Sequence, residues 1–203
     1  MVSYQYYYFV PQLSSLVYGQ VPPITSKAFM EKAAPILGEK DAALLGMLNL
    51  DPPLPEPEPG DDSGRPAGPA SSGCDFIDGW REWEKALRLN LARLRSAEMG
   101  RDEDGLPDVP PVPSGAVAAA AKAIGAETPL EGERIIDKAR WDAIEALQGT
   151  DLFHRRTVFA YLMKLIILER QASFQAETGF SEYKSLYDSI LEQSGASSTG
   201  ESK

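Results

Sequence analysis

The sequence predicts a mainly α-helical protein, a multi-helix bundle with one long helix. Three observations predict this class. Apolar residues recur at helical spacing through most of the chain, capping residues stand at the ends of these runs, and two acidic, proline-rich stretches separate them. The chain has 203 residues, of which 43% are hydrophobic and 25% charged. This composition is typical of a globular protein and disfavours a wholly disordered or membrane-embedded chain.

The first fifty residues begin with an aromatic run, Tyr4 to Val10, which the sequence leaves open between a helix and a short strand. Aromatic residues favour strands, but no other segment offers an obvious partner strand. Ser26 is the expected N-cap of a helix from Lys27 to about Leu37, and Gly38 separates it from a helix over residues 41–48. The first of these two helices is expected to bury Phe29, Met30 and Ala33.

Two segments combine many prolines with a high density of acidic residues. Residues 51–69 hold seven prolines and five acidic residues, and residues 98–113 hold four prolines and five acidic residues. Each has a single basic residue, so together they account for −8 of the formal charge of −10. Proline donates no backbone hydrogen bond, and such segments bury little apolar surface. They are therefore predicted to be extended or disordered linkers.

A tryptophan-rich helix is predicted from Gly79 to Glu98, ended by Gly100. Its apolar residues lie at intervals of 3, 4, 4 and 3, which indicates one buried face. These residues are Trp80, Trp83, Leu87, Leu91 and Leu94.

Further helices follow the second linker. Ser114 and Gly125 bracket an alanine-rich helix, and Thr128 followed by Pro129 opens a helix that ends near Gly149. The longest helix is expected to open at Thr150 or Asp151, to run to about Thr178, and to bury one side. A last helix, capped by Ser181, is predicted to reach Leu191.

These elements predict the organisation of the chain. It comprises an aromatic segment with short helices (1–50), a linker (51–75), the tryptophan-rich helix (76–100), a second linker (101–113), the C-terminal helices (114–194) and a frayed tail (195–203). Residues 76–194 are expected to form one helical domain, with residues 1–50 packed on it.

Motifs that carry chemistry are scarce. The sequence has no glycine-rich phosphate loop, one cysteine (Cys74) and one histidine (His154), so no cofactor or metal site is predicted. His154 is interpreted as a surface residue rather than a catalytic base. The chain is expected to be cytoplasmic, since its N-terminus resembles no signal peptide. Its most apolar stretch, Val158 to Leu168, is too short to cross a bilayer.

Charged residues gather on the helix that follows Pro129. Glu133, Asp137 and Trp141 follow each other at a spacing of four, with basic residues within reach. Ordinary ion pairing explains this cluster. The alternative is a small helical enzyme that uses Glu133, Asp137 and Arg140 in a cleft beside Trp141, which would require these side chains to converge on a pocket.

The tryptophan-rich helix also has a basic flank. A formal charge of −10 and the lack of a nucleic-acid-reading motif disfavour nucleic acid as its partner. A solvated flank or a face for an acidic protein partner is the favoured interpretation, and Asn90 lies at the edge of the apolar stripe, where it could fix how helices align. The candidate interface residues are Arg81, Lys85, Arg88, Asn90, Arg95 and Trp141.

Three segments together resemble a known family. They are the aromatic opening followed by Pro22-Pro23-Ile24 and Phe29; Trp80, Trp83-Glu84, Leu87-Arg88, Asn90-Leu91 and Arg93-Leu94-Arg95; and Pro129-Leu130-Glu131, Ile136-Asp137, Trp141, Tyr161-Leu162, Lys164-Leu165 and Leu168-Glu169. They resemble an uncharacterised bacterial family whose genes lie among those of V-type ATPase subunits. Its members look like remote counterparts of the rotor subunit called C in prokaryotes and d in eukaryotes.

The resemblance implies a non-catalytic accessory or central-stalk subunit that couples or helps to assemble a V-type ATPase. It implies other subunits of that ATPase as partners, in the stalk or the membrane ring, and a position peripheral to the inner membrane. This implication is an analogy between families. A general helical interaction module without a link to the ATPase remains a further alternative.

Overall fold

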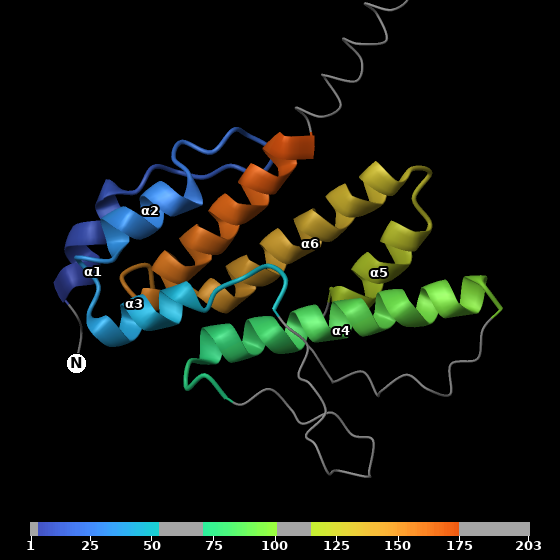
Figure 1. Cartoon of the computed structure of the whole chain (residues 1–203), viewed down its shortest axis with the longest axis horizontal. Helices are drawn as coiled ribbons and strands as arrows, with labels where there is room; N and C mark the ends of the chain where they lie inside the picture. Colours follow the sequence, from blue (N-terminus) through green and yellow to red (C-terminus); the bar gives the residue numbers. More distant parts are fainter. Residues whose placement is uncertain (1–3, 53–70, 101–114, 175–203) are drawn as a thin grey trace, which may run out of the picture.

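The computed structural model describes residues 4–52, 71–100 and 115–174, and Figure 1 shows their arrangement as a bundle of helices. The chain is mainly α-helical, as the sequence predicts, and the described residues include no strand. The helices before the first gap are α1 (Tyr4–Phe9), the 3₁₀ helix η1 (Val10–Gln12), α2 (Ser26–Ala33) and α3 (Glu39–Gly46). Those after it are α4 (Asp75–Glu98), α5 (Ala116–Ile124) and α6 (Pro129–Gln148), followed by a helix over residues 155–174, which has no label in Figure 1.

The helix over residues 155–174 lies at the centre of the core. Every residue from 157 to 163 on it is buried, whereas the sequence predicted burial of one side only. A helix that is apolar all round is covered on all sides. Figure 1 shows what covers it: α1 and α2 lie against one side, and α6 lies alongside the other. It begins at residue 155, a few residues after the predicted start, and the structure describes it to residue 174.

Helix starts show where local capping signals succeed and fail. Thr128 caps α6 as predicted, because its hydroxyl oxygen accepts a hydrogen bond from the backbone N–H of Glu131 at 3.2 Å. The cap of α2 is Thr25 rather than the predicted Ser26, since Thr25 accepts from the N–H of Ala28 at 3.1 Å. The backbone N–H of Ser26 instead donates to Glu169 at 2.6 Å.

Other predicted boundaries also differ from the structure, among them those of α4 and α2. α4 begins at Asp75, inside the predicted linker and four residues before Gly79, because Phe76 and Ile77 are buried and extend its apolar face. α2 ends at Ala33 rather than near Leu37, and its Met30 is 38% exposed rather than buried. The rest of the first linker (53–70), the second linker, the helix predicted from Ser181 and the frayed tail lie outside the described residues.

The aromatic N-terminus is a helix, which resolves the alternative that the sequence left open. Tyr6 and Phe9 of α1 are buried, and the ring of Phe9 lies 6.0 Å from that of Phe29 on α2. Phe29 in turn packs 4.9 Å from the ring of Tyr161 on the central helix. Residues 4–50 therefore pack on the bundle through aromatic contacts, each of which adds roughly 1 kcal/mol to area burial.

Tryptophan side chains anchor α4 to the segment after α3. Trp80 and Trp83 stack with ring centroids 5.7 Å apart, and both are buried as predicted. The indole N–H of Trp80 donates to the carbonyl oxygen of Asn49 at 2.9 Å. In the described part of the chain, no helix has the length and apolar character needed to cross a bilayer.

Candidate functional site

A buried ion-pair cluster joins α4 to α6. Arg140 of α6 reaches Glu84 of α4 through two hydrogen bonds, from Nη2 to Oε1 at 2.6 Å and from Nε to Oε2 at 3.1 Å. Its Nη1 also donates to Asp137 Oδ1 at 3.3 Å. Glu84, Asp137 and Arg140 are the charged residues that the core buries in the described ranges. We call these three residues the clamp.

Two outer arginines extend the clamp. Arg88 donates from Nε to Glu84 at 3.1 Å and also pairs with Asp51, which follows α3. Arg170 of the central helix pairs with Glu133, and its Nη1 lies 3.8 Å from the carboxylate of Asp137. The cluster therefore ties α4, α6, the central helix and the end of the N-terminal segment to one another.

Burial and ion pairing shift the pKa values of Asp137 and Arg140. Burial raises the pKa of Asp137, and the charges of Arg170 and Arg140 offset this effect only in part. For Arg140, burial alone would lower the pKa, but the hydrogen bonds and charges of Glu84 and Asp137 outweigh it and raise the pKa. The guanidinium of Arg140 is therefore held charged, while the carboxyl group of Asp137 is harder to ionise than that of an exposed aspartate.

A surface trough of about 770 Å³ lies beside the clamp. Trp83 and Gly79 of α4, the face of α5 that carries Ala118 and Ala119, and α6 form its walls. The walls of α5 and α6 meet at their shared turn, where a Cβ on Gly132 would lie 2.9 Å from the carbonyl oxygen of Ala123. A glycine is required at this position for the two helices to come so close.

The trough follows α6 along nearly its whole length. Its lining on this helix includes two adjacent rows with a spacing of four residues, one mostly charged and one mostly apolar. The first row is Leu130, Arg134, Lys138, Asp142 and Ala146, and the second is Glu131, Ile135, Ala139, Ala143 and Leu147. With a rise of 1.5 Å per residue, these rows are about 26 Å long.

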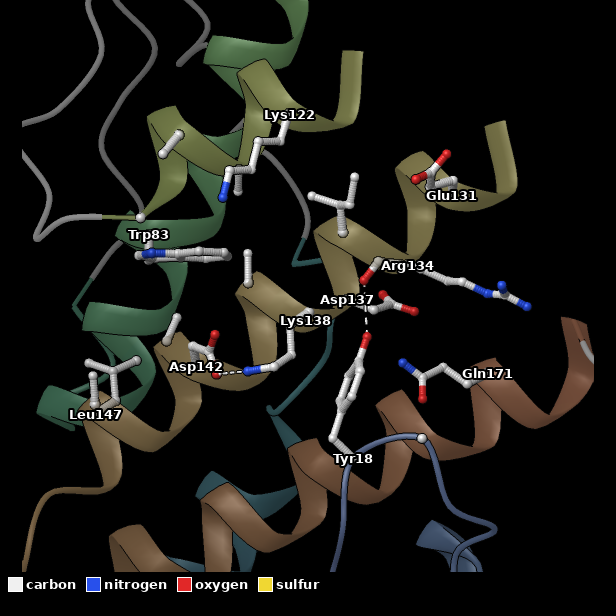
Figure 2. A pocket seen from close by; sticks show the side chains of 18 of the residues that line it. Tyr18, Trp83, Lys122, Glu131, Arg134, Asp137, Lys138, Asp142, Leu147 and Gln171 are labelled. Atoms are coloured by element: carbon white, nitrogen blue, oxygen red, sulfur yellow. Dashed lines mark hydrogen bonds and ion pairs between the residues drawn. The ribbon is translucent and has the colours of Figure 1, made fainter. Parts of the chain in front are cut away.

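Tyr18 covers part of α6 at the edge of the trough (Figure 2). Its hydroxyl donates to the carbonyl oxygen of Arg134 at 3.0 Å, and its ring meets that of Trp141 edge-on at 5.5 Å. Burial and the nearby charge of Asp137 raise the pKa of Tyr18, so it remains a hydrogen-bond donor at neutral pH. The segment that carries Tyr18 is thereby fixed to α6.

The charges of the trough differ in whether they have a partner. Lys138 and Asp142 pair with each other, as Figure 2 shows. Asp137 belongs to the clamp. Lys122 on α5 and Arg134 on α6, by contrast, have side chains without an ion-pair partner among the described residues, and so do Glu82 and Glu131. Figure 2 shows Lys122 extending from α5 toward Trp83.

The residues of the predicted interface do not line this trough. Arg81, Lys85 and Arg95 lie on another face of α4, and Arg88 is committed to Glu84 and Asp51. Asn90 is a satisfied amide, because its Nδ2 donates to the carbonyl oxygen of Ala86 at 2.8 Å.

Trp141 is not part of an exposed interface, contrary to the prediction. It is only 5% exposed, because Tyr18 packs on its ring and Lys164 lies 5.0 Å from the ring centroid. Its indole N–H donates to Glu145 at 3.0 Å.

The residues of the enzymatic alternative, Glu133, Asp137 and Arg140, lie close together, but they are engaged in ion pairs. Arg170 pairs with Glu133 and Asp137, and Asp137 pairs directly with Arg140. Of the three predicted residues, only Asp137 lines the trough. His154 lies just before the central helix, where its Nδ1 accepts from the N–H of Arg156 at 3.3 Å. Within the described ranges, no cluster of histidine, cysteine or acidic residues could hold a metal ion.

Sequence reasoning missed Glu84 and the trough. Glu84 lies among the apolar residues of α4, between Trp83 and Leu87, and an acid in that position indicates a buried partner. The trough has a weaker signal, which is the alanine at positions 118, 139, 143 and 146, where larger apolar residues would fill the space between helices.

Comparison with known proteins gives one match. A family model described as a protein of unknown function (DUF2764) matches residues 120–194. This range begins in the middle of α5 and includes α6 and the central helix, and thus most of the trough lining and two members of the clamp. No curated protein and no solved structure matches the chain.

Replacing Arg140 with methionine should lower the free energy of unfolding by about 3 kcal/mol, because it leaves Glu84 and Asp137 buried without their shared partner. The measurement is urea denaturation followed by circular dichroism. Arg156→Met is the matched control, since it removes an arginine that pairs with the exposed Asp75 at 3.0 Å. That variant should lose no more than about 1 kcal/mol. Equal losses in the two variants would contradict the role of the clamp.

Asp137 should make the protein less stable as the pH rises. Its raised pKa means that the folded state keeps a proton that the unfolded chain has lost, so the contribution of this carboxyl to the unfolding free energy falls above the ordinary value of 3.8. Asp137→Asn removes the titration. Its stability relative to the native chain should therefore improve as the pH rises above about 4. A stability difference that does not change with pH above this value, measured by urea denaturation, would refute the prediction.

Proposed function

We propose that this chain is a non-catalytic accessory or central-stalk subunit of a bacterial V-type ATPase, which couples or helps to assemble that complex. The resemblance of its three segments to the family encoded among V-type ATPase genes motivates the proposal. The observation that carries it is the clamp, because a part that transmits force or positions other subunits must hold its helices in a fixed relation.

The clamp supports this role through its geometry. A guanidinium that forms two hydrogen bonds with one carboxylate fixes direction as well as distance. Arg140 and Glu84 are 56 positions apart in the chain and belong to different helices, so their pairing resists sliding of α4 along α6. Arg170 and Arg88 add the central helix and the segment after α3 to the same body.

The segments that carry the resemblance also supply the core. Phe29, Trp80 and Leu87 are each no more than 1% exposed, as are Leu162 and Leu168. Residues of the resemblance thus contribute to the core from α2, α4 and the central helix. Because these residues lie in the core of several helices, the resemblance favours a function that depends on the helical bundle as a whole rather than on one loop.

A tagged chain purified from its own cells should bring down subunits of the V-type ATPase, and deletion of its gene should reduce ATP-driven ion pumping by membrane vesicles. Restoring the native chain or Arg156→Met should recover pumping. Arg140→Met, expressed at the same level, should recover less, because its helices are no longer held in register.

Two results would overturn the proposal. The first is a pull-down without any ATPase subunit, together with unchanged pumping and ATP hydrolysis after deletion. The second is conversion of a small metabolite by the purified chain that is lost on replacing Asp137 with asparagine, which would favour the enzymatic alternative.

A further inference from the structure

We infer that the trough between α4, α5 and α6 is the docking site for one amphipathic α-helix of another polypeptide, seated lengthwise on α6 with an apolar stripe inward and an acidic side chain beside Lys122. The inference goes beyond the proposed function by naming the surface and the kind of segment that it binds. It rests on that function only in the expectation that a subunit of the same ATPase supplies the helix.

The shape of the trough favours an elongated occupant. Its lining runs for about 26 Å along the two rows of α6, whereas a compact small molecule fills a short, enclosed site. Four to five turns of an α-helix, at about 5.4 Å per turn, span that length.

The walls suit a helix backbone. Ala118 and Ala139 stand on opposite walls, and Ala143 and Ala146 continue the wall of α6. Small side chains on both walls let the axis of a third helix approach closely, as in ridges-into-grooves packing. Trp83 also lines the trough, where the 5% of its surface that stays exposed would meet an aliphatic side chain of the partner.

The charges select the partner and its placement. Lys122 and Arg134 lie on opposite walls near the α5–α6 turn, and neither has an ion-pair partner among the described residues. Glu131 lies in the same region, but the N-terminus of α6 partly offsets its charge. Glu82 on α4 is the unpaired acid beside Trp83. An acidic side chain of the partner beside Lys122 therefore has a complement there, and a basic side chain at the same place is disfavoured.

The test places a photo-crosslinking phenylalanine analogue at position 146, an exposed position at the end of the trough lining, or at position 121, which is exposed on α5 outside the lining. After irradiation of cells that produce the full chain, mass spectrometry identifies the crosslinked peptide. We expect position 146, and not position 121, to yield a peptide with apolar residues at spacings of three and four and with an acidic residue.

Two kinds of substitution, one that reverses a charge and one that fills the trough, then test whether the partner helix binds there. Lys122→Glu should lower the yield of this adduct about five-fold at low salt, and less at high salt, whereas Lys40→Glu on α3 should leave it unchanged. A synthetic peptide of the crosslinked sequence should bind the purified chain. Ala143→Trp, which fills the trough, should weaken that binding at least about ten-fold, and Ala121→Trp should not.

The possible outcomes separate this inference from the proposed function. If the crosslinked peptide is an amphipathic helix from a protein unrelated to the ATPase, the docking inference is supported and the proposed function is contradicted. Crosslinking at position 146 to a peptide of this same chain, to lipid, or to a segment without an apolar stripe would overturn the docking inference. The same holds if Lys122→Glu and Lys40→Glu have equal effects.

Discussion

The guanidinium of Arg140 lies between two buried carboxylates, Glu84 on α4 and Asp137 on α6, which would repel each other without it. Glu84 and Asp137 are buried on facing helices, and each would pay a large desolvation cost without a cation between them. The position of α6 against α4 is therefore set by a charge balance as well as by apolar packing. Apolar contacts alone tolerate small slips between helices, but a two-fold hydrogen-bonded ion pair does not.

This constraint also shapes the surface. Because the clamp holds one face of α6 against α4 and the central helix, the neighbouring rows of α6 face the trough beside α5. Tyr18 fixes the other edge by donating to the backbone of Arg134. The same contacts that stabilise the bundle thus keep the trough open in a defined shape, as a docking surface requires.

Much of the fold follows from local signals in the sequence. Thr128 with Pro129 marks the start of α6 and Gly149 its end, and the stripe of Trp80, Trp83 and Leu87 marks the buried face of α4. Caps and apolar spacing involve residues within one or two turns of each other, so they can be recognised from the sequence of a single helix. The aromatic N-terminus was ambiguous because its composition favours a strand, whereas packing of Tyr6 and Phe9 on the bundle decides for a helix.

The site was harder to predict, since it depends on contacts between distant residues. Ion pairing of Asp137 with Arg140 is visible at a spacing of three, but their common partner Glu84 belongs to another helix. Trp141 was predicted at an interface because no local pattern shows that Tyr18, from a distant loop, covers it. The trough is an empty space between helices, and a sequence records such a space only through small residues such as Ala139.

The central claim is that the clamp makes α4, α6 and the central helix one mechanical body. Native-state hydrogen exchange across a series of low urea concentrations tests it most directly, because it reports which segments open together. The account predicts that buried amides of these three helices share one opening free energy and one dependence on urea. Opening of α4 at a lower free energy, while α6 and the central helix stay protected, would contradict it.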